Sequence, residues 1–261
     1  MVNNRHRQFW IWGVFILSCV ATALLYLFNW NHAVFHAVNG TGSVLGPLPA
    51  AALTILGDGL IVAVLILPFI RVRRDVLWSL FWAALIWTLM VHILKQSLDV
   101  PRPPRVLDAE SFILIGRKRG AHAFPSGHTA TIFGFAGVWV FRLKKINVSF
   151  VLLVLAILVG LSRIAVGVHW PADVAAGAAI GWISAYAGIL LEDRLKWSRF
   201  NGPALWIGIL LLISAVVLLI SYDTGYREVE ALRYAVGAVC FVLGLVEWIR
   251  LFRESRAEKT V

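Results

Sequence analysis

The sequence predicts an all-α fold, a polytopic membrane bundle of about eight transmembrane helices, and three observations lead to this prediction. Hydrophobic residues make up 60% of the 261 residues and charged residues only 15%, which is more apolar than a water-soluble domain. The apolar residues form runs of the roughly 20 residues that a helix needs to cross a bilayer. Lysine and arginine alternate between the connections, and the 12 tryptophans suit a membrane interface.

The apolar runs are expected to form the membrane helices of one domain, residues 1–261. In chain order they are 9–28, 50–70, 76–94, 126–141, 148–168, 172–191, 204–220 and 232–251. The first run could instead be a signal peptide, because Arg5 and Arg7 precede it. Its apolar stretch is long for that, and no clear small-residue cleavage site follows, so we expect a retained helix.

The basic residues predict which helix ends face the cytoplasm, where Lys and Arg of short loops are retained. One alternating set of connections is basic: 5–7, 71–74, 142–145, 194–199 and 250–259. Both termini are therefore expected inside. On the other side, segment 29–50 has no Lys or Arg, whereas segment 95–119 has six. An anionic ligand is the natural reason for cations on the side where topology disfavours them.

Charge and cysteine content argue against other classes of protein. A net charge of +10 can indicate nucleic acid, but in a polytopic chain it is typical of cytoplasmic loops, so no nucleic-acid partner is expected. Cys19 and Cys240 lie in apolar runs, which favours neither a disulfide framework nor a zinc site. Asp58 lies inside the second run and is a functional candidate unless it is hydrated near the outer end.

His169 and Asp173 form the first polar cluster that carries chemistry. Pro171 fits the first position of a helix, which puts Asp173 in the first turn. The carboxylate can then reach back to one imidazole nitrogen and leave the other free as a nucleophile. The alternative is that Asp173 only caps the helix and His169 is a surface residue.

A second cluster, at residues 125–128, also opens a helix. Pro125 can begin the helix, Gly127 allows close approach to the backbone, and the free N–H groups of the first turn favour an anion. Ser126 adds a hydroxyl donor, and His128 titrates near neutral pH and can act as a general acid. The alternative is a plain helix start with an incidental histidine.

A third cluster supplies the cations. Arg102 offers a planar fork suited to phosphate oxygens, Lys95 offers a mobile point charge, and Arg163 is a third cation. Taken singly, Lys95 could snorkel at a helix end and Arg102 could be a loop residue. These alternatives weaken together, because three cations, two histidines and a carboxylate are expected on one membrane face.

Together the three clusters resemble the signature motifs of the type 2 phosphatidic acid phosphatase superfamily. Residues 95–103 read Lys, six residues, Arg-Pro; residues 125–128 read Pro-Ser-Gly-His; residues 162–173 read Ser-Arg, five residues, His, three residues, Asp. The resemblance covers about residues 76–191. It implies a six-helix lipid phosphatase core within residues 1–200, followed by two additional C-terminal helices in 201–261 that have no assigned role.

The resemblance implies a role for each matched position. His169 would attack phosphorus and form a phosphohistidine, Asp173 would orient it, and His128 would protonate the leaving oxygen. Five residues would hold the phosphate: Lys95, Arg102, Ser126, Gly127 and Arg163. No metal and no other cofactor is expected, because the family needs none and few carboxylates lie near the motifs.

The implied function is hydrolysis of a membrane lipid phosphate or diphosphate at the extracytoplasmic face of a bacterial inner membrane. Three more cations, Arg117, Lys118 and Arg119, favour an anionic head group, with undecaprenyl diphosphate as the preferred substrate. Lipid A 1-phosphate is the second candidate, and transfer of phosphate to another lipid is an alternative reaction. A non-catalytic lipid transporter or binding protein is the alternative from another class. The sequence leaves the oligomeric state open.

Overall fold

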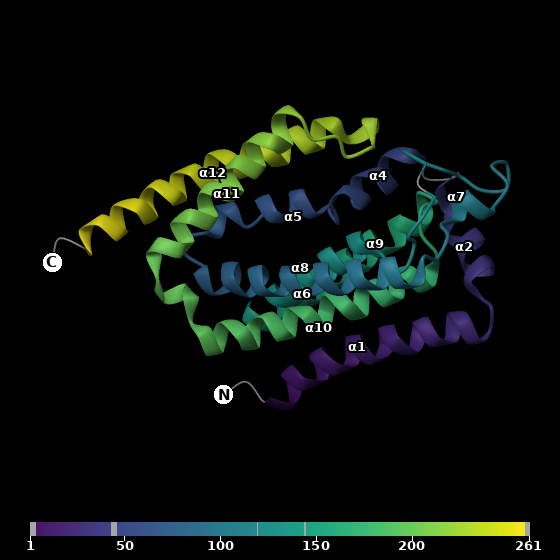
Figure 1. The fold of residues 1–261 in the computed structure, drawn as a ribbon, viewed down its shortest axis with the longest axis horizontal. Coiled ribbons are helices and arrows are strands. Elements are labelled where there is room, and N and C mark those ends of the chain that lie inside the picture. Colours follow the sequence, from purple (N-terminus) through teal and green to yellow (C-terminus); the bar gives the residue numbers. More distant parts are fainter. Residues whose placement is uncertain (1–3, 43–45, 119, 144, 259–261) are drawn as a thin grey trace.

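The computed structural model describes residues 4–42, 46–118, 120–143 and 145–258, which form an all-α helical bundle (Figure 1). In chain order its helices are α1 (Asn4–Leu27), α2 (Asn31–Asn39), α4 (Pro47–Ile55), α5 (Gly59–Val64), η1 (Leu67–Phe69), α6 (Arg74–Leu98), α7 (Pro103–Val106), α8 (Gly127–Leu143), α9 (Ile146–Ala165), α10 (Pro171–Leu195), η2 (Trp197–Arg199), α11 (Asn201–Ile220), η3 (Arg227–Val229) and α12 (Glu230–Ala257).

Six segments in the described part of the chain are long and apolar enough to cross a membrane: Trp10–Leu27, Arg74–Val106, Ile146–Ala165, Pro171–Leu195, Asn201–Ile220 and Arg227–Ala257. A bent pair, Pro47–Ile55 with Gly59–Phe69, gives a seventh if it is counted as one span. The chain is thus an integral membrane protein with multiple spans. The prediction of about eight is borne out in part, with six or seven candidate spans. The remaining predicted run is α8, whose 17 residues measure about 26 Å against a hydrocarbon core of about 30 Å and lie at the lower end of the length of a spanning helix.

The predicted helix at 50–70 is broken, with a bend of 55° between its halves. Asp58 caps the second half, because its Oδ1 accepts hydrogen bonds from the backbone N–H of Leu60 at 2.9 Å and of Ile61 at 3.4 Å. Its Oδ2 accepts from the Tyr222 hydroxyl at 2.6 Å. Gly57 lies against the start of α8, where an added Cβ would be 2.9 Å from the His128 carbonyl oxygen. Asp58 is therefore a helix cap and a tie to the C-terminal hairpin.

The centre of the bundle is the packing of α8 against α6, α9 and α10. Glycines in α10 let the backbones of α8 and α10 approach closely. A Cβ on Gly181 would lie 2.1 Å from the Ala130 carbonyl oxygen, and a Cβ on Gly177 would lie 2.5 Å from the Ser126 carbonyl oxygen. The Ser126 N–H donates to the Asp173 carbonyl oxygen at 2.9 Å. This contact fixes the start of α10 against the start of α8.

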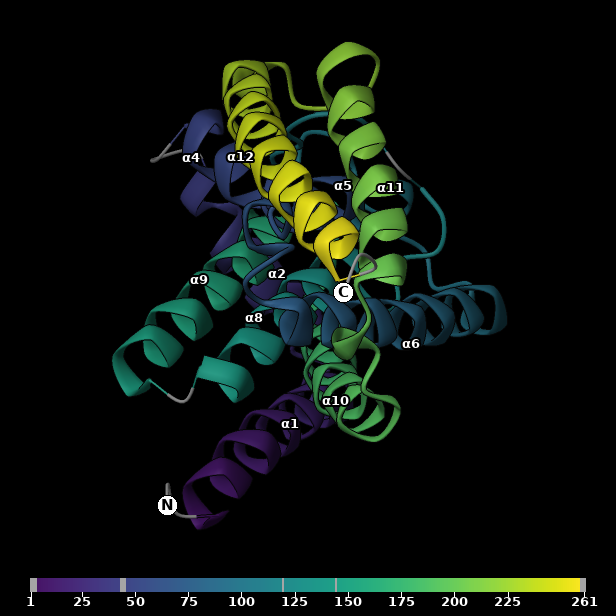
Figure 2. The same ribbon diagram turned by 90° about the vertical axis from the view of Figure 1, so that its left-hand side faces the viewer.

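The additional helices α11 and α12 form a hairpin on one side of the central helices, and α1 lies on the opposite side (Figures 1 and 2). The hairpin packs closely on the bent helix, since a Cβ on Gly244 would lie 2.7 Å from Leu67 Cβ. Arg71 fastens it by ion pairs to Glu247 at 2.6 Å and Glu254 at 3.1 Å. The hairpin is therefore part of the packed bundle.

The polar motifs meet at one end of the bundle. The two termini lie at the opposite end from α7 and α2, and α6 ends beside α7 (Figure 1). The end of α6, the start of α8, the end of α9 and the start of α10 are joined by the hydrogen bonds described below. The alternating directions of the helices thus bring three distant stretches of sequence together.

Candidate active site

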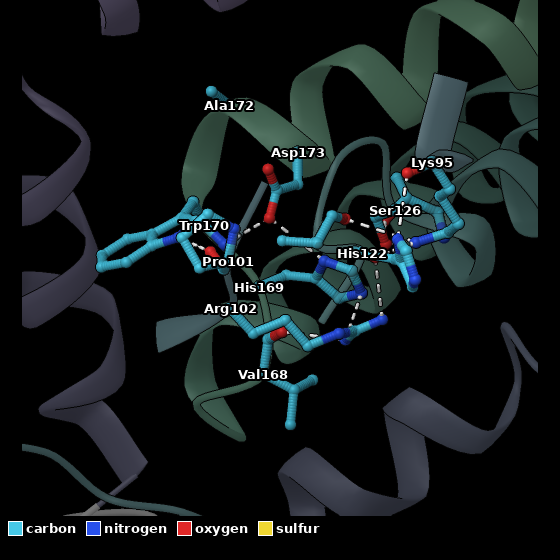
Figure 3. Close-up of polar contacts among 12 residues, drawn as sticks. Lys95, Pro101, Arg102, His122, Ser126, Val168, His169, Trp170, Ala172 and Asp173 are labelled. Atoms are coloured by element: carbon cyan, nitrogen blue, oxygen red, sulfur yellow. Dashed lines mark hydrogen bonds and ion pairs between the residues drawn. The ribbon is translucent and has the colours of Figure 1, made fainter. Parts of the chain in front are cut away.

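His169 is held between a carboxylate and a guanidinium at the centre of the site (Figure 3). Its Nδ1 lies 3.2 Å from Asp173 Oδ2, and its Nε2 lies 3.0 Å from Arg102 Nη1. A guanidinium can only donate, so Nε2 accepts and the imidazole proton is on Nδ1, from which it is donated to Asp173. Nε2 therefore keeps the lone pair that a nucleophile requires.

Asp173 both caps α10 and contacts the His169 imidazole, which the sequence left as alternatives. Its Oδ2 accepts from the Trp170 N–H at 2.8 Å, which caps the start of α10, and the same oxygen accepts from His169. Pro171 is the first residue of the helix, so the carboxylate returns over the turn as expected. Asp173 is fully buried, and its Oδ1 has no hydrogen-bond partner among the described residues.

The electrostatic surroundings of His169 keep it neutral. Burial, followed by the positive charges of Arg102, Arg163 and Lys95, holds the pKa of its imidazole well below the ordinary value of 6.5. The side chain is only 2% exposed and is therefore poorly hydrated. At neutral pH the His169 imidazole is therefore uncharged.

Arg102 is fixed by backbone oxygens. Its Nε donates to the Ala121 carbonyl at 2.9 Å, and its Nη1 donates to the Val168 carbonyl at 3.0 Å as well as to His169. Nη2 is 3.4 Å from the His122 carbonyl oxygen. The guanidinium is buried, and its plane is set before any substrate arrives.

Lys95 lies beside Arg102, because both side chains contact the carbonyl oxygen of His122. Its ammonium donates to the His122 carbonyl oxygen and is 3.5 Å from that of Ala123 (Figure 3). His122 returns the contact, with Nδ1 3.0 Å from the Lys95 carbonyl oxygen and 3.1 Å from Asp99 Oδ1. His122 belongs to none of the three sequence motifs. Its positive φ of 54° depends on the folded loop and leaves no signal in the sequence.

The start of α8 carries Ser126, Gly127 and His128. Ser126 is fully buried, and its Oγ accepts from Thr129 Oγ1 at 2.9 Å and from Thr129 N at 3.4 Å, as a helix cap does. Packing does not force a glycine at 127, because an added Cβ would meet only Val91, at 3.8 Å. The glycine therefore leaves room at the N-terminus of α8. His128 is partly exposed.

Arg163 and Ser162 have different surroundings at the end of α9. Ser162 Oγ lies 2.7 Å from Thr54 Oγ1 and donates to the Val159 carbonyl at 2.7 Å, so it ties helices together. Arg163 is buried; its Nη1 donates to the Tyr226 hydroxyl at 3.0 Å, and its Nε has no partner among the described residues. A buried, half-satisfied guanidinium is a suitable anion donor.

Two of the extra cations, Arg117 and Lys118, are exposed and are not among the charges that lower the pKa of His169. Arg117 is 66% exposed and forms an ion pair with Asp223, and Lys118 is exposed. Arg119 lies outside the described residues. Within the described ranges, no three His, Cys, Asp or Glu side chains are grouped so as to hold a metal ion.

Comparisons with known sequences agree with this geometry. Residues 75–197 match the model of the PAP2 superfamily. The lipid A 1-phosphatase of Rhizobium johnstonii is 32% identical over 114 residues, which cover 42% of this chain and 46% of that protein. The bacitracin transport permease protein BcrC of Bacillus licheniformis is 48% identical over 64 residues, 24% of this chain and 30% of that protein. The matches thus span less than half of these curated relatives.

Solved structures share the architecture. LpxE of Aquifex aeolicus aligns with a TM-score of 0.55 and 29% identity, covering 61% of this chain and 94% of that chain. The transmembrane PAP2-type phosphatidylglycerolphosphate phosphatase of Bacillus subtilis aligns with a TM-score of 0.52 over 72% of this chain and 98% of that one. At 20% identity the second likeness concerns the fold alone. The sequence match ends at residue 197, before α11 begins.

Proposed function

We propose that this chain is a membrane lipid phosphate phosphatase of the PAP2 superfamily, whose model matches residues 75–197, and that it acts through a phosphohistidine on His169. The observation that carries the proposal is the contact pair at the imidazole, 3.2 Å to Asp173 and 3.0 Å to Arg102. Asp173 stabilises the Nδ1 proton, and Nε2 attacks. A non-catalytic lipid transporter would not need a histidine held between a carboxylate and a guanidinium in this way.

The reaction has two steps. In the first, Nε2 bonds to phosphorus while the bond from phosphorus to the lipid oxygen breaks, and His128 gives its proton to that oxygen. In the second, water attacks phosphorus, the nitrogen–phosphorus bond breaks, and His128 accepts a proton from the water. One water is consumed, and inorganic phosphate is released.

Five groups are proposed to hold the phosphate: the side chains of Lys95, Arg102 and Arg163, and the start of α8 at Ser126 and Gly127. The unpaired Nε of Arg163 supports this role, because a buried N–H without an acceptor is costly until an anion occupies the site. The open space at Gly127 supports it too, since backbone N–H groups of a helix start bind anions. Such fixed donors supply most of what phosphoryl transfer requires.

Two substrates are proposed for test. Undecaprenyl diphosphate follows from the surplus of cations at 117–119, but the pairing of Arg117 with Asp223 removes one of them from a second phosphate. Lipid A 1-phosphate is supported by the 32% identity to a lipid A 1-phosphatase. We therefore favour lipid A 1-phosphate as the substrate. Transfer of the phosphate to another lipid alcohol remains a possible second half-reaction, because water and an alcohol attack phosphorus in the same way.

The proposed location is a bacterial inner membrane, with the site on the extracytoplasmic face and both termini in the cytoplasm. The alternation of Lys and Arg supports this orientation. The opposite placement of the termini and α7 is compatible with it (Figure 1).

Purified protein in nanodiscs should release inorganic phosphate from a panel of lipid A 1-phosphate, undecaprenyl diphosphate, phosphatidylglycerol phosphate and phosphatidic acid. His169→Ala is the control and should release none. A phosphorylated lipid that accumulates in place of free phosphate would identify a phosphotransferase. Equal phosphate release by wild type and His169→Ala would contradict the proposal.

A further inference from the structure

The connection between α11 and α12, residues 221–229, reaches the phosphate site. Tyr226 is 7% exposed, and its hydroxyl oxygen accepts from Arg163 Nη1 at 3.0 Å. Arg163 is one of the cations proposed to hold the phosphate. A tyrosine from the part of the chain beyond the family match therefore touches a residue of the family's third motif.

Two other contacts fasten this connection over the site. Asp223 forms an ion pair with Arg117 and also accepts from the Gly225 N–H at 2.6 Å, which closes a tight turn at a φ of 85°. Tyr222 donates to Asp58 Oδ2 at 2.6 Å, at the break in the bent helix. The loop is thus held by the bent helix, by segment 116–117 and by Arg163, each from a different part of the chain.

The fit of Tyr226 is close. Its ring lies over Gly116, where an added Cβ would be 2.7 Å from the ring and 2.8 Å from the Gly225 carbonyl oxygen. Gly116 also has a φ of 82°, which L side chains rarely adopt. The position of the ring is therefore determined by the backbone beneath it, and the hydroxyl is held at a fixed point relative to Arg163.

The loop also shares a cavity with the proposed acid. His128, Arg163 and Val168 line a narrow cavity of about 10 Å³ together with Thr224, Gly225 and Tyr226 of the loop and with Arg117. At that size it has room for about one water molecule. The loop is thus a wall of the space between the general acid and a phosphate-binding cation.

We propose that Tyr226 is a positioning residue of the phosphatase, which orients the Arg163 guanidinium so that its remaining donors face the phosphate. The guanidinium is planar and rigid, so a bond at Nη1 restricts the directions in which Nε can point. Nε is the atom without a partner among the described residues. The hairpin of α11 and α12 thereby supplies a part of the active site. This inference rests on the proposed function.

The test compares Tyr226→Phe with Tyr234→Phe, the same chemical change on an exposed residue of the same hairpin. Tyr226→Phe keeps the ring over Gly116 and removes only the hydroxyl. For the lipid phosphate that the wild type hydrolyses fastest, its kcat/KM should fall about tenfold, as expected for one bond to a charged group. The inhibition constant of orthovanadate should rise by a similar factor. Tyr234→Phe should match the wild type in both.

A double-mutant cycle separates positioning from packing. If Tyr226 acts through Arg163, then Tyr226→Phe should have little further effect in an Arg163→Gln background, whether or not the melting temperature changes. The same tenfold loss in both backgrounds, or an unchanged vanadate constant in Tyr226→Phe, would overturn the inference. A wild-type protein that releases phosphate from no lipid would instead overturn the proposed function.

Discussion

The backbone N–H of Ser126 donates to the carbonyl oxygen of Asp173 at 2.9 Å, and this one bond joins the start of α8, which is proposed to bind phosphate, to the start of α10, whose Asp173 contacts His169. The two residues are far apart in sequence and are brought together by glycines in α10. The spacing between the proposed acid and the nucleophile therefore depends on helix packing well below the site.

Gly181→Leu should disrupt this spacing. Any Cβ at 181 would lie 2.1 Å from the Ala130 carbonyl oxygen, so α8 and α10 must separate. We expect a loss of about 1–3 kcal/mol in stability, typical of overpacking, together with lower turnover. Thermal unfolding in detergent measures the first and phosphate release the second.

Gly202→Leu is the matched control, because no atom lies within 4 Å of a Cβ at that position of α11. It should unfold and turn over as the wild type does. Equal behaviour of the two leucine variants would show that the α8–α10 contact does not set the site.

His128→Ala should be sensitive to the leaving group. If His128 protonates the leaving oxygen, its loss costs roughly 10²–10⁴-fold on a lipid alcohol. The loss should shrink on p-nitrophenyl phosphate, whose phenolate needs no proton to depart. The His169→Ala defect should remain on both substrates, since the nucleophile is needed in each case. Recovery of both variants on the activated substrate would refute the division of roles.

In a plot of kcat/KM against pH, the midpoint of the acidic limb should lie below pH 6.5, the ordinary pKa of a histidine. Burial and the nearby cations lower the pKa of His169, so the base stays unprotonated as pH falls and loses activity only when pH passes below that lowered pKa. Lys95→Gln removes one of those cations, so the pKa should rise and the limb should move toward neutral pH.

Arg105→Gln is the control for this shift, since Arg105 is an exposed cation of the nearby helix α7 and is not among the charges that lower the His169 pKa. Its limb should coincide with that of the wild type. A Lys95→Gln limb that moves to lower pH would contradict the electrostatic account, whatever its effect on the maximal rate.

The cations at 117–119 test the substrate. Neutralising Arg117, Lys118 and Arg119 together should reduce turnover of undecaprenyl diphosphate more than turnover of phosphatidic acid, if they meet a second phosphate. Asp223→Asn is informative beside it, because it frees Arg117 from its ion pair without removing a cation. Equal losses on both lipids, or none, would leave the three residues as a solvated loop.

Much of this organisation could be predicted from the sequence where the cause is local. Apolar runs predicted the long helices, and the spacing of His169, Pro171 and Asp173 predicted a carboxylate reaching back over a helix start, because four residues and a proline suffice for that contact. The break at Asp58 could not be predicted in the same way. The Asp58 carboxylate caps α5 with one oxygen, and its other oxygen is bound by Tyr222, from a distant helix end that the sequence does not place beside it.

Tyr226 was beyond sequence reasoning for a related cause. It is one of two tyrosines in a short polar connection, 63 residues from Arg163, and nothing in its neighbours indicates a phosphate site. Only the packing of α11 and α12 on the bent helix carries that connection to the motif end of the bundle. The role of the C-terminal helices therefore depends on tertiary contacts.

The central claim is that His169 carries the phosphate, and trapping the covalent intermediate tests it most directly. Protein mixed with ³²P-labelled lipid phosphate and quenched in base should carry label that is lost in acid, as expected of a phosphorus–nitrogen bond, and peptide mapping should place it on His169. His169→Ala should carry none, and chase with unlabelled substrate should remove the label from the wild type at least as fast as turnover. Label on another residue, or rapid turnover with no labelled protein at any time, would contradict the account.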